Sequence, residues 1–162
     1  MNEADLRRLD DQSAKEKKVK ALLLTCMDYR YPQAILNYMD KKGLTGDYDH
    51  VILAGASLGA NLDTKPWIMP HWRDTFFDHV DAALKLHSIT MVYILDHRDC
   101  GAYRIFRGLP EDVERQEETD AHKLEMYKLR DEIKRRYVNV SVDFGLLEKL
   151  EGEEEFTVLE IE

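Results

Sequence analysis

The chain has 162 residues, a length that predicts one domain large enough to bury a core of its own. Its 23 Lys and Arg residues against 32 Asp and Glu residues give a formal net charge of −9. Nonspecific binding to nucleic acid or to an anionic membrane is therefore excluded as a main function, because either would need a strongly basic face. No apolar run approaches the roughly 20 residues of a membrane span. Residues 1–8 lack the apolar core of a signal peptide, so a cytoplasmic location is expected.

The apolar pattern predicts strands that alternate with helices along the chain. A charged segment over residues 1–19 is expected to be a short helix or arm that packs on a partner. Residues 20–162 are expected to form one domain. Its predicted strands cover residues 20–25, 51–54, 90–96, 138–144 and 156–161. One predicted helix covers residues 32–39. A second contains an apolar stripe of Phe77, Val80 and Leu84 and ends near His87. A third contains an apolar stripe of Met126, Leu129, Ile133 and Tyr137.

This alternation predicts an α/β fold, in which a mainly parallel sheet of about four parallel strands plus an edge strand is flanked by helices. The strand over residues 90–96 is continuously apolar, so it is expected to be covered on both faces. Residues 61–72 are expected to form a loop. The acidic run over residues 111–120 is expected to be a solvated surface.

Two cysteines and one histidine directly follow predicted strands. Cys26 comes after the apolar run 21–24, and His97 and Cys100 come after the apolar run 91–95. Open parallel sheets bind ligands at the carboxyl ends of their strands. The three side chains should therefore converge if the first and third predicted strands are neighbours. Two thiolates and an imidazole suit zinc and leave a fourth tetrahedral position unassigned, so the sequence predicts a zinc site.

Other interpretations of these residues remain open at this point. The two cysteines are also consistent with inert buried thiols, since free cysteine is often buried. A disulfide is not expected in a chain without a secretion signal. The remaining histidines lack ligand spacing and are expected to be surface or hydrogen-bonded residues; they are His50, His71, His79, His87 and His122.

The two motifs together resemble those of the beta-class carbonic anhydrases. That family carries Cys-x-Asp-x-Arg after its first strand and His-x-x-Cys-Gly after its third. This sequence has Cys26-Met27-Asp28-Tyr29-Arg30 and His97-Arg98-Asp99-Cys100-Gly101, and the resemblance runs from about Lys20 to the C-terminus. Leu53 and Ala54 stand where the family usually has Arg-Asn, so polar contacts in that part of the cleft are lost.

The resemblance implies a zinc lyase that hydrates carbon dioxide reversibly to bicarbonate by metal-bound hydroxide. Asp28 would accept a hydrogen bond from the hydroxide, and Arg30 would hold Asp28 in a bidentate pair. With Asp28 on the metal instead, the site would be closed. Backbone groups at Gly55 and Gly101 are expected to approach the anionic product, since glycine permits close backbone contact. The resemblance also implies a homodimer or a dimer of dimers.

Three alternatives change the function, and the first two of them keep the same metal ligands. Relatives on this fold hydrolyse carbonyl sulfide or carbon disulfide, and a narrow, apolar entrance would favour that reaction. A noncatalytic, zinc-stabilised dimer that binds a partner is the second alternative, with Asp28 as a permanent fourth ligand. A thiol redox role is the third and the weakest, because the cysteines lack the close pairing of a dithiol motif.

Overall fold

The sheet is the frame on which the rest of the molecule is built. The computed structural model describes residues 18–62, 71–150, 152 and 154–162. Within them, five strands form one sheet in the order β2-β1-β3-β4-β5. The neighbours from β2 to β4 pair in parallel, and β5 pairs with β4 in antiparallel fashion. The strands are β1 (Ala21–Thr25), β2 (Tyr48–Ile52), β3 (Met91–His97), β4 (Ser141–Glu148) and β5 (Thr157–Ile161).

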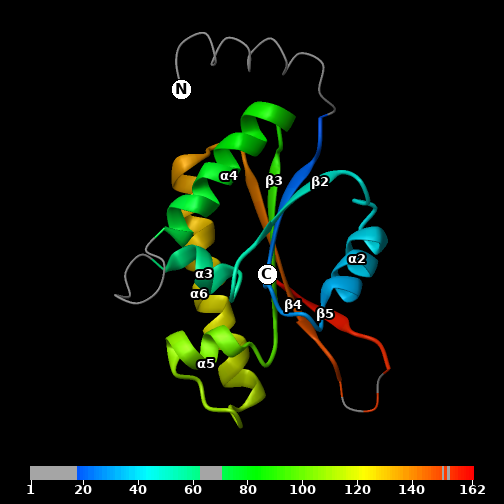
Figure 1. Ribbon diagram of the computed structural model, residues 1–162, viewed down its shortest axis with the longest axis vertical. Coiled ribbons are helices and arrows are strands. Elements are labelled where there is room, and N and C mark those ends of the chain that lie inside the picture. The colour runs from blue at the N-terminus through cyan, green and yellow to red at the C-terminus, as the bar shows by residue number, and fades with distance from the viewer. Residues whose placement is uncertain (1–17, 63–70, 151, 153) are drawn as a thin grey trace.

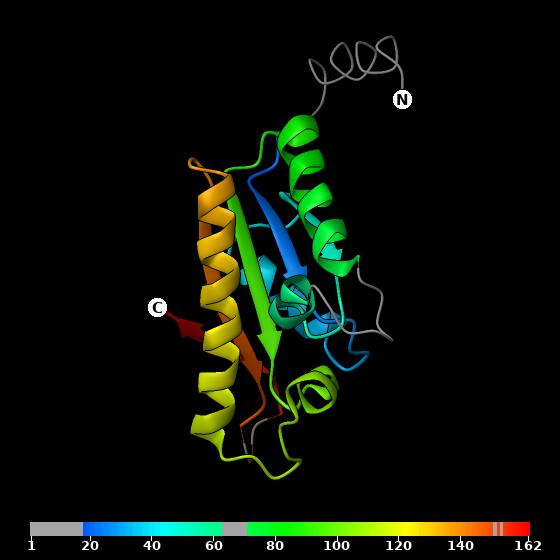
Figure 2. The same cartoon turned by 90° about the vertical axis from the view of Figure 1, so that its left-hand side faces the viewer.

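Helices cover both faces of this sheet, as Figure 1 shows. The described helices are α2 (Pro32–Lys41), α3 (Ser57–Asn61), α4 (Trp72–His87), α5 (Gly101–Arg107) and α6 (Arg115–Arg136). One face carries α2, whereas α3, α4 and α6 cover the other, and Figure 2 looks onto that second face. The short α5 lies beyond the carboxyl end of β3. The predicted α/β fold with a mainly parallel sheet is therefore confirmed.

The apolar side chains of the central strands divide between two cores because successive residues of a strand point to opposite faces. Leu22 and Leu24 pack on the side of α3, α4 and α6, and Leu23 packs on the side of α2. All five residues of β1 and all but the first residue of β3 are buried. Each fully buried leucine contributes about 1.5–3 kcal/mol. The expectation that residues 90–96 are covered on both faces is thus confirmed over the strand.

Several element bounds differ from the predicted ones. Strand β2 begins three residues before the predicted start and ends before Leu53. Strand β4 starts at Ser141 rather than at Val138, because a turn in which the Val140 amide donates to the Tyr137 carbonyl precedes it. Helix α4 begins at Trp72, upstream of the apolar stripe that predicted it. Helix α3 was not predicted, since its five residues are too short to display a helical period.

Two predicted segments fall partly or wholly outside the described part of the chain. The predicted arm over residues 1–19 lies outside it except for Lys18 and Val19. Most of the predicted loop over 61–72 lies outside it as well, since residues 63–70 are not described. Among the described residues, no helix combines the length and the apolar character that crossing a membrane requires.

Gly145 of β4 occupies a place that a side chain would overfill. A Cβ there would lie 2.6 Å from Val158 Cγ1 and 2.9 Å from Leu95 Cδ1. We therefore expect Gly145→Ala to lower the free energy of unfolding by about 1–3 kcal/mol, measured by urea denaturation. Gly101→Ala is the matched control, because a Cβ at Gly101 would meet nothing within 4 Å. A Gly145→Ala protein as stable as this control would contradict the packing of β5 on β4.

Candidate metal centre

Parallel pairing of β1 and β3 brings the three predicted ligands together at the carboxyl ends of the strands. Thr25 is level with Leu95 in the register, so Cys26 and His97 emerge at the same edge of the sheet. Cys100 lies three residues after His97 and directly precedes α5. The ligand atoms of Cys26, His97 and Cys100 all lie within 4.8 Å of one another. The expected convergence is confirmed, and the three side chains are close enough to bind a metal ion.

The geometry of the donor atoms fits a tetrahedral metal ion. The two cysteine Sγ atoms are 3.9 Å apart. Two thiolates on one tetrahedral zinc, with Zn–S bonds of about 2.3 Å, would lie roughly 3.8 Å apart. The side chains of His97 and Cys100 are buried, and Cys26 is 9% exposed. No disulfide joins the cysteines.

His97 presents one ring nitrogen to this centre. Its Nδ1 donates to the Arg98 carbonyl oxygen at 2.7 Å, which fixes the hydrogen on Nδ1 and leaves the lone pair on Nε2. Within the described residues, this buried Nε2 has no hydrogen-bond partner. An unpaired buried polar atom costs about 1–3 kcal/mol. A metal ion bound to Nε2 would remove that cost, so the orphaned nitrogen supports the fit.

The two sulfur atoms differ in their surroundings. Cys26 Sγ accepts a hydrogen bond from the Gly55 amide at 3.2 Å and contacts Cys100 Sγ. The Cys100 contact lowers the pKa of Cys26, whereas burial opposes this shift. The same sulfur–sulfur contact and burial raise the pKa of Cys100. The site thus stabilises one thiolate by itself, and a dication between the sulfurs would favour the thiolate form of both.

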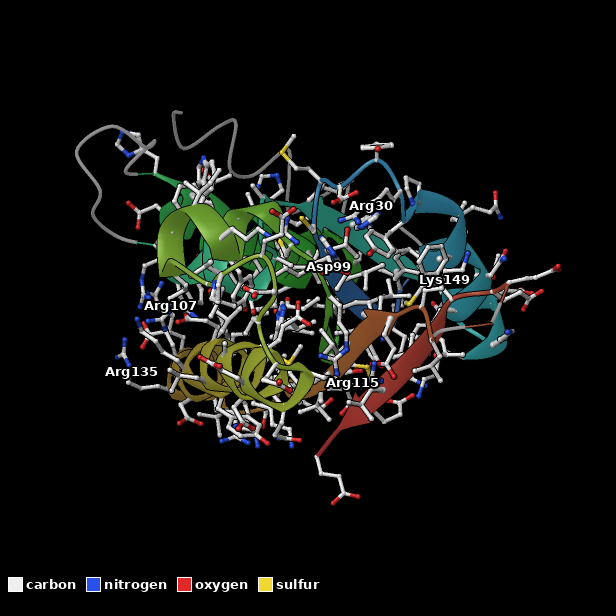
Figure 3. All side chains as sticks on the ribbon, turned by 90° about the horizontal axis from the view of Figure 1, so that it is seen from below. Arg30, Asp99, Arg107, Arg115, Arg135 and Lys149 are labelled. Carbon is white, nitrogen blue, oxygen red and sulfur yellow. The ribbon has the colours of Figure 1, made fainter. Side chains whose placement is uncertain are left out.

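Asp28 and Arg30 form a bidentate pair beside the ligands. Arg30 donates from Nε to Oδ1 at 2.9 Å and from Nη2 to Oδ2 at 2.7 Å. Its Nη2 also donates to the Asp99 carbonyl at 3.1 Å, and Figure 3 shows Arg30 and Asp99 close together at this end of the sheet. The hydrogen bonds that Arg30 donates to Asp28 lower the pKa of Asp28 to about 2, although burial opposes the shift. Asp28 is therefore an oriented carboxylate, with Oδ2 3.9 Å from His97 Nε2.

The two glycines that were expected to approach the product have different surroundings. Gly55 has φ +77°, a conformation that favours glycine, and a Cβ there would lie 2.9 Å from the Ala102 Cβ. Its amide already donates to Cys26 Sγ, so this N–H supports a ligand. Gly101 starts α5, with open space beside its Cα. Contact of either residue with a product stays a prediction.

An apolar pocket of about 320 Å³ opens beside Cys26 and Asp28. Its other walls come from the start of α2 and from β2, and they include Ile35, Leu36 and Ile52. His50 also lines the pocket, and its Nε2 lies 2.7 Å from the Thr25 hydroxyl oxygen. Pockets with apolar walls and a few polar groups are typical of small-molecule sites. This pocket suits a small uncharged molecule.

Arg98, which lies between two ligands, is held in a buried polar network. Its Nε donates to Glu148 at 2.7 Å, its Nη1 to Glu118 at 3.1 Å and its Nη2 to the Thr119 hydroxyl at 2.8 Å. All four residues are buried. The network attaches the turn between the ligands to β4 and α6. Removing one partner of such a buried ion pair typically costs about 3–5 kcal/mol.

The expectation that the acidic run over residues 111–120 is a solvated surface is wrong for part of α6. Glu118 is only 7% exposed. Its carboxylate accepts hydrogen bonds from the Arg98 side chain and, at 2.7 Å, from the Asp99 amide. Asp99 has φ +54°, and the hydrogen bond to Glu118 holds it in this left-handed conformation. A charge run in sequence does not reveal which of its members will face a buried arginine.

A second buried network of hydrogen bonds, centred on Asp96, was not predicted from the sequence. Asp96, at the end of β3, accepts hydrogen bonds from Ser57, Tyr103 and His122. His122, expected to be a surface or hydrogen-bonded residue, is fully buried and hydrogen-bonded. The one available signal was a carboxylate that ends an otherwise apolar strand. The partners lie far away in the sequence, on elements whose positions are set by packing.

Comparison with known proteins places this chain in a family. A family model described as "Putative carbonic anhydrase" matches residues 16–147, and the chain belongs to this family. The structure also resembles the beta-carbonic anhydrase CafA of the fungal pathogen Aspergillus fumigatus, with a TM-score of 0.50 and 14% identity. That match covers 96% of this chain and 82% of the other, and it shows a shared fold.

Two bacterial relatives are more similar in sequence. The chain is 33% identical over 135 residues to an uncharacterized protein of Rickettsia conorii. This match covers 83% of this chain and 70% of that protein. It is also 33% identical over 135 residues to an uncharacterized protein of Rickettsia bellii, covering 83% of this chain and 79% of the relative. Neither relative carries a named activity.

Replacing His97 tests whether the three ligand atoms hold one ion. We expect His97→Asn to weaken zinc binding by more than about 100-fold. Loss of a residue that only supports a ligand weakens metal binding by up to about 100-fold, and loss of a ligand itself should weaken it more. The metal-loaded protein should also lose thermal stability, because metal-binding energy is folding energy. Chelator competition and metal analysis measure the first effect. His79→Asn, on an exposed face of α4, is the control, and equal zinc affinities in the two variants would contradict the assignment.

Proposed function

We propose that this protein catalyses the reversible hydration of carbon dioxide to bicarbonate, with zinc held by Cys26, His97 and Cys100. The observation that carries the proposal is the Arg30-held carboxylate of Asp28, which lies 3.9 Å from the free nitrogen of His97. Membership of a carbonic anhydrase family supports the same conclusion.

The donor set supports zinc as the metal. Two sulfurs and an imidazole suit zinc, and three protein ligands leave one of four tetrahedral positions for water or substrate, as in catalytic sites. Zinc bound there would supply Lewis acidity and lower the pKa of a water molecule. Because two thiolates offset its charge, this effect is weaker than in a site with histidines alone. The protein must therefore contribute by orienting the nucleophile.

Asp28 is the group that can provide this orientation. As an ionised carboxylate it accepts a hydrogen bond from the attacking water or hydroxide and directs an oxygen lone pair towards carbon. Arg30 fixes the carboxylate through two parallel hydrogen bonds, so little freedom is lost when the nucleophile binds. A new carbon–oxygen bond forms, the electron pair of one C=O π bond moves to its oxygen, and a proton leaves to buffer.

The pocket beside Asp28 supports carbon dioxide as the substrate. Its apolar walls at Ile35, Leu36 and Ile52 offer no charge to a substrate, which matches an uncharged linear molecule. The same walls favour one alternative, hydrolysis of carbonyl sulfide or carbon disulfide, since these molecules are also linear and still less polar. In the described conformation Asp28 is held by Arg30, which favours an open site over one closed permanently by that carboxylate.

We propose further that the protein self-associates as a homodimer or dimer of dimers. Three large apolar side chains that line the pocket are 54–68% exposed, namely Met27, Leu36 and Ile52, and the neighbouring Tyr29 is 88% exposed. They lie on the turn after β1, on α2 and on the edge strand β2. Clustered apolar side chains on a surface usually mark an interface. A second copy of the chain would cover them.

Stopped-flow hydration assays on the zinc-loaded protein, at pH 7 and 8.5, test the activity. We expect Asp28→Asn to keep its zinc but to lower kcat/KM by about 100-fold, the lower range for loss of a positioned proton acceptor. Asp131→Asn, at an exposed carboxylate of α6, is the control and should match the wild type.

Other outcomes would contradict the proposal. A wild-type protein with stoichiometric zinc and no hydration at either pH would favour the noncatalytic dimer. Faster turnover of carbonyl sulfide or carbon disulfide than of carbon dioxide would favour the hydrolase.

A charge at the exposed apolar cluster tests self-association. We expect Ile52→Glu to dissociate the oligomer into monomers, because burying an unpaired carboxylate at an interface is costly. Sedimentation velocity measures the state of assembly. Ile105→Glu on α5, where the replaced side chain is 65% exposed, is the matched control and should leave the assembly intact. A monomeric wild-type protein would contradict this part of the proposal.

A further inference from the structure

The carboxylate of Asp96 lies at the centre of a buried network directly behind the metal centre. Asp96 immediately precedes His97 on β3 and is 1% exposed. Successive strand residues point to opposite faces, so Asp96 points to the side of α3 and α6 while His97 points to the side of Tyr31, whose ring centroid is 4.3 Å from that of His97. Asp96 therefore cannot touch a metal ion at His97, yet it is bonded to the backbone that carries this ligand.

Ser57 connects Asp96 to Cys26, which directly follows β1. The Ser57 amide donates to Asp96 Oδ1 at 3.0 Å and the Ser57 hydroxyl donates to Oδ2 at 2.6 Å. These bonds hold the turn before α3, in which Gly55 has φ +77° and Ala56 has φ +41°. A non-glycine residue in such a conformation costs about 1–3 kcal/mol unless its surroundings enforce it. The same turn presents the Gly55 amide to Cys26 Sγ at 3.2 Å.

Tyr103 connects Asp96 to the third ligand. Its hydroxyl donates to Asp96 Oδ2 at 2.9 Å and lies 3.0 Å from the Ser57 hydroxyl. Tyr103 is 1% exposed and belongs to the first turn of α5, where its amide donates to the Cys100 carbonyl at 3.1 Å. The position of α5, and with it the position of Cys100, is thus tied to the same carboxylate.

We infer that Asp96 is the positioning residue of this metal centre, because one carboxylate links the separate segments that carry Cys26, His97 and Cys100. A buried carboxylate that accepts several hydrogen bonds is stable only when its donors are all in place. The three segments are therefore held in one arrangement before a metal ion binds, and metal affinity depends on residues that do not touch the ion. The inference concerns metal binding and would deepen the proposed function.

Variants of the two connecting residues test this inference with metal affinity as the readout. We expect Ser57→Ala and Tyr103→Phe each to weaken zinc binding by about 10- to 100-fold, the usual effect of losing support for a ligand. Chelator competition measures the affinity. The absorption bands of the cobalt(II)-substituted proteins should also shift, because they report ligand geometry.

Matched controls separate positioning from simple stabilisation. Tyr93→Phe removes a buried hydroxyl on β3 that donates to Glu160 at 3.3 Å, and Ser141→Ala removes a hydroxyl that donates to the Thr90 carbonyl at 3.3 Å. Both should leave the zinc affinity and the cobalt spectrum unchanged. If Ser57→Ala and Tyr103→Phe bind zinc as tightly as these controls, with unchanged cobalt spectra, the inference is overturned.

The outcome is independent of the activity. A wild-type protein that binds zinc tightly but hydrates no carbon dioxide would overturn the proposed function and leave the role of Asp96 to be decided by the affinities. A wild-type protein that binds neither zinc nor cobalt would overturn both.

Discussion

The parallel pairing of β1 with β3 is the constraint on which the rest of this structure depends. Parallel strands end at the same edge of a sheet, so two short motifs far apart in sequence emerge beside each other. The apolar side chains of both strands are buried between helices on either face, which prevents a shift in register. A shift by one residue would exchange the faces and separate Cys26 from His97.

Two buried networks then restrain the turns beyond these strands. They flank His97 on both sides in the sequence, one built on Asp96 and one on Arg98. Both networks reach α6, one through His122 and the other through Glu118. Because unpaired buried polar groups are costly, each network is stable mainly as a whole. Such cooperativity gives the candidate ligands fixed positions, although Cys26 and Cys100 lie in turns outside the strands.

The open side of the metal centre has a different character. Asp28 is held by Arg30 near the surface, and the adjoining pocket has mostly apolar walls. A fixed negative charge at the edge of a mostly apolar pocket can orient a nucleophile without attracting an anionic substrate. This division, with buried networks behind the ligands and an oriented carboxylate in front of them, is the basis for the proposed hydration of carbon dioxide.

The sequence by itself determined the approximate strands, the class of fold and the three residues that lie close enough to bind a metal. Strand periodicity and the motifs at Cys26 and His97 are local features, so they can be read without knowing what packs against them. Only the tertiary structure decided the short α3, the start of β4, the burial of Glu118 and the partners of Asp96. These depend on contacts between residues far apart in the chain, because a polar side chain becomes buried only where distant elements supply its hydrogen-bond partners.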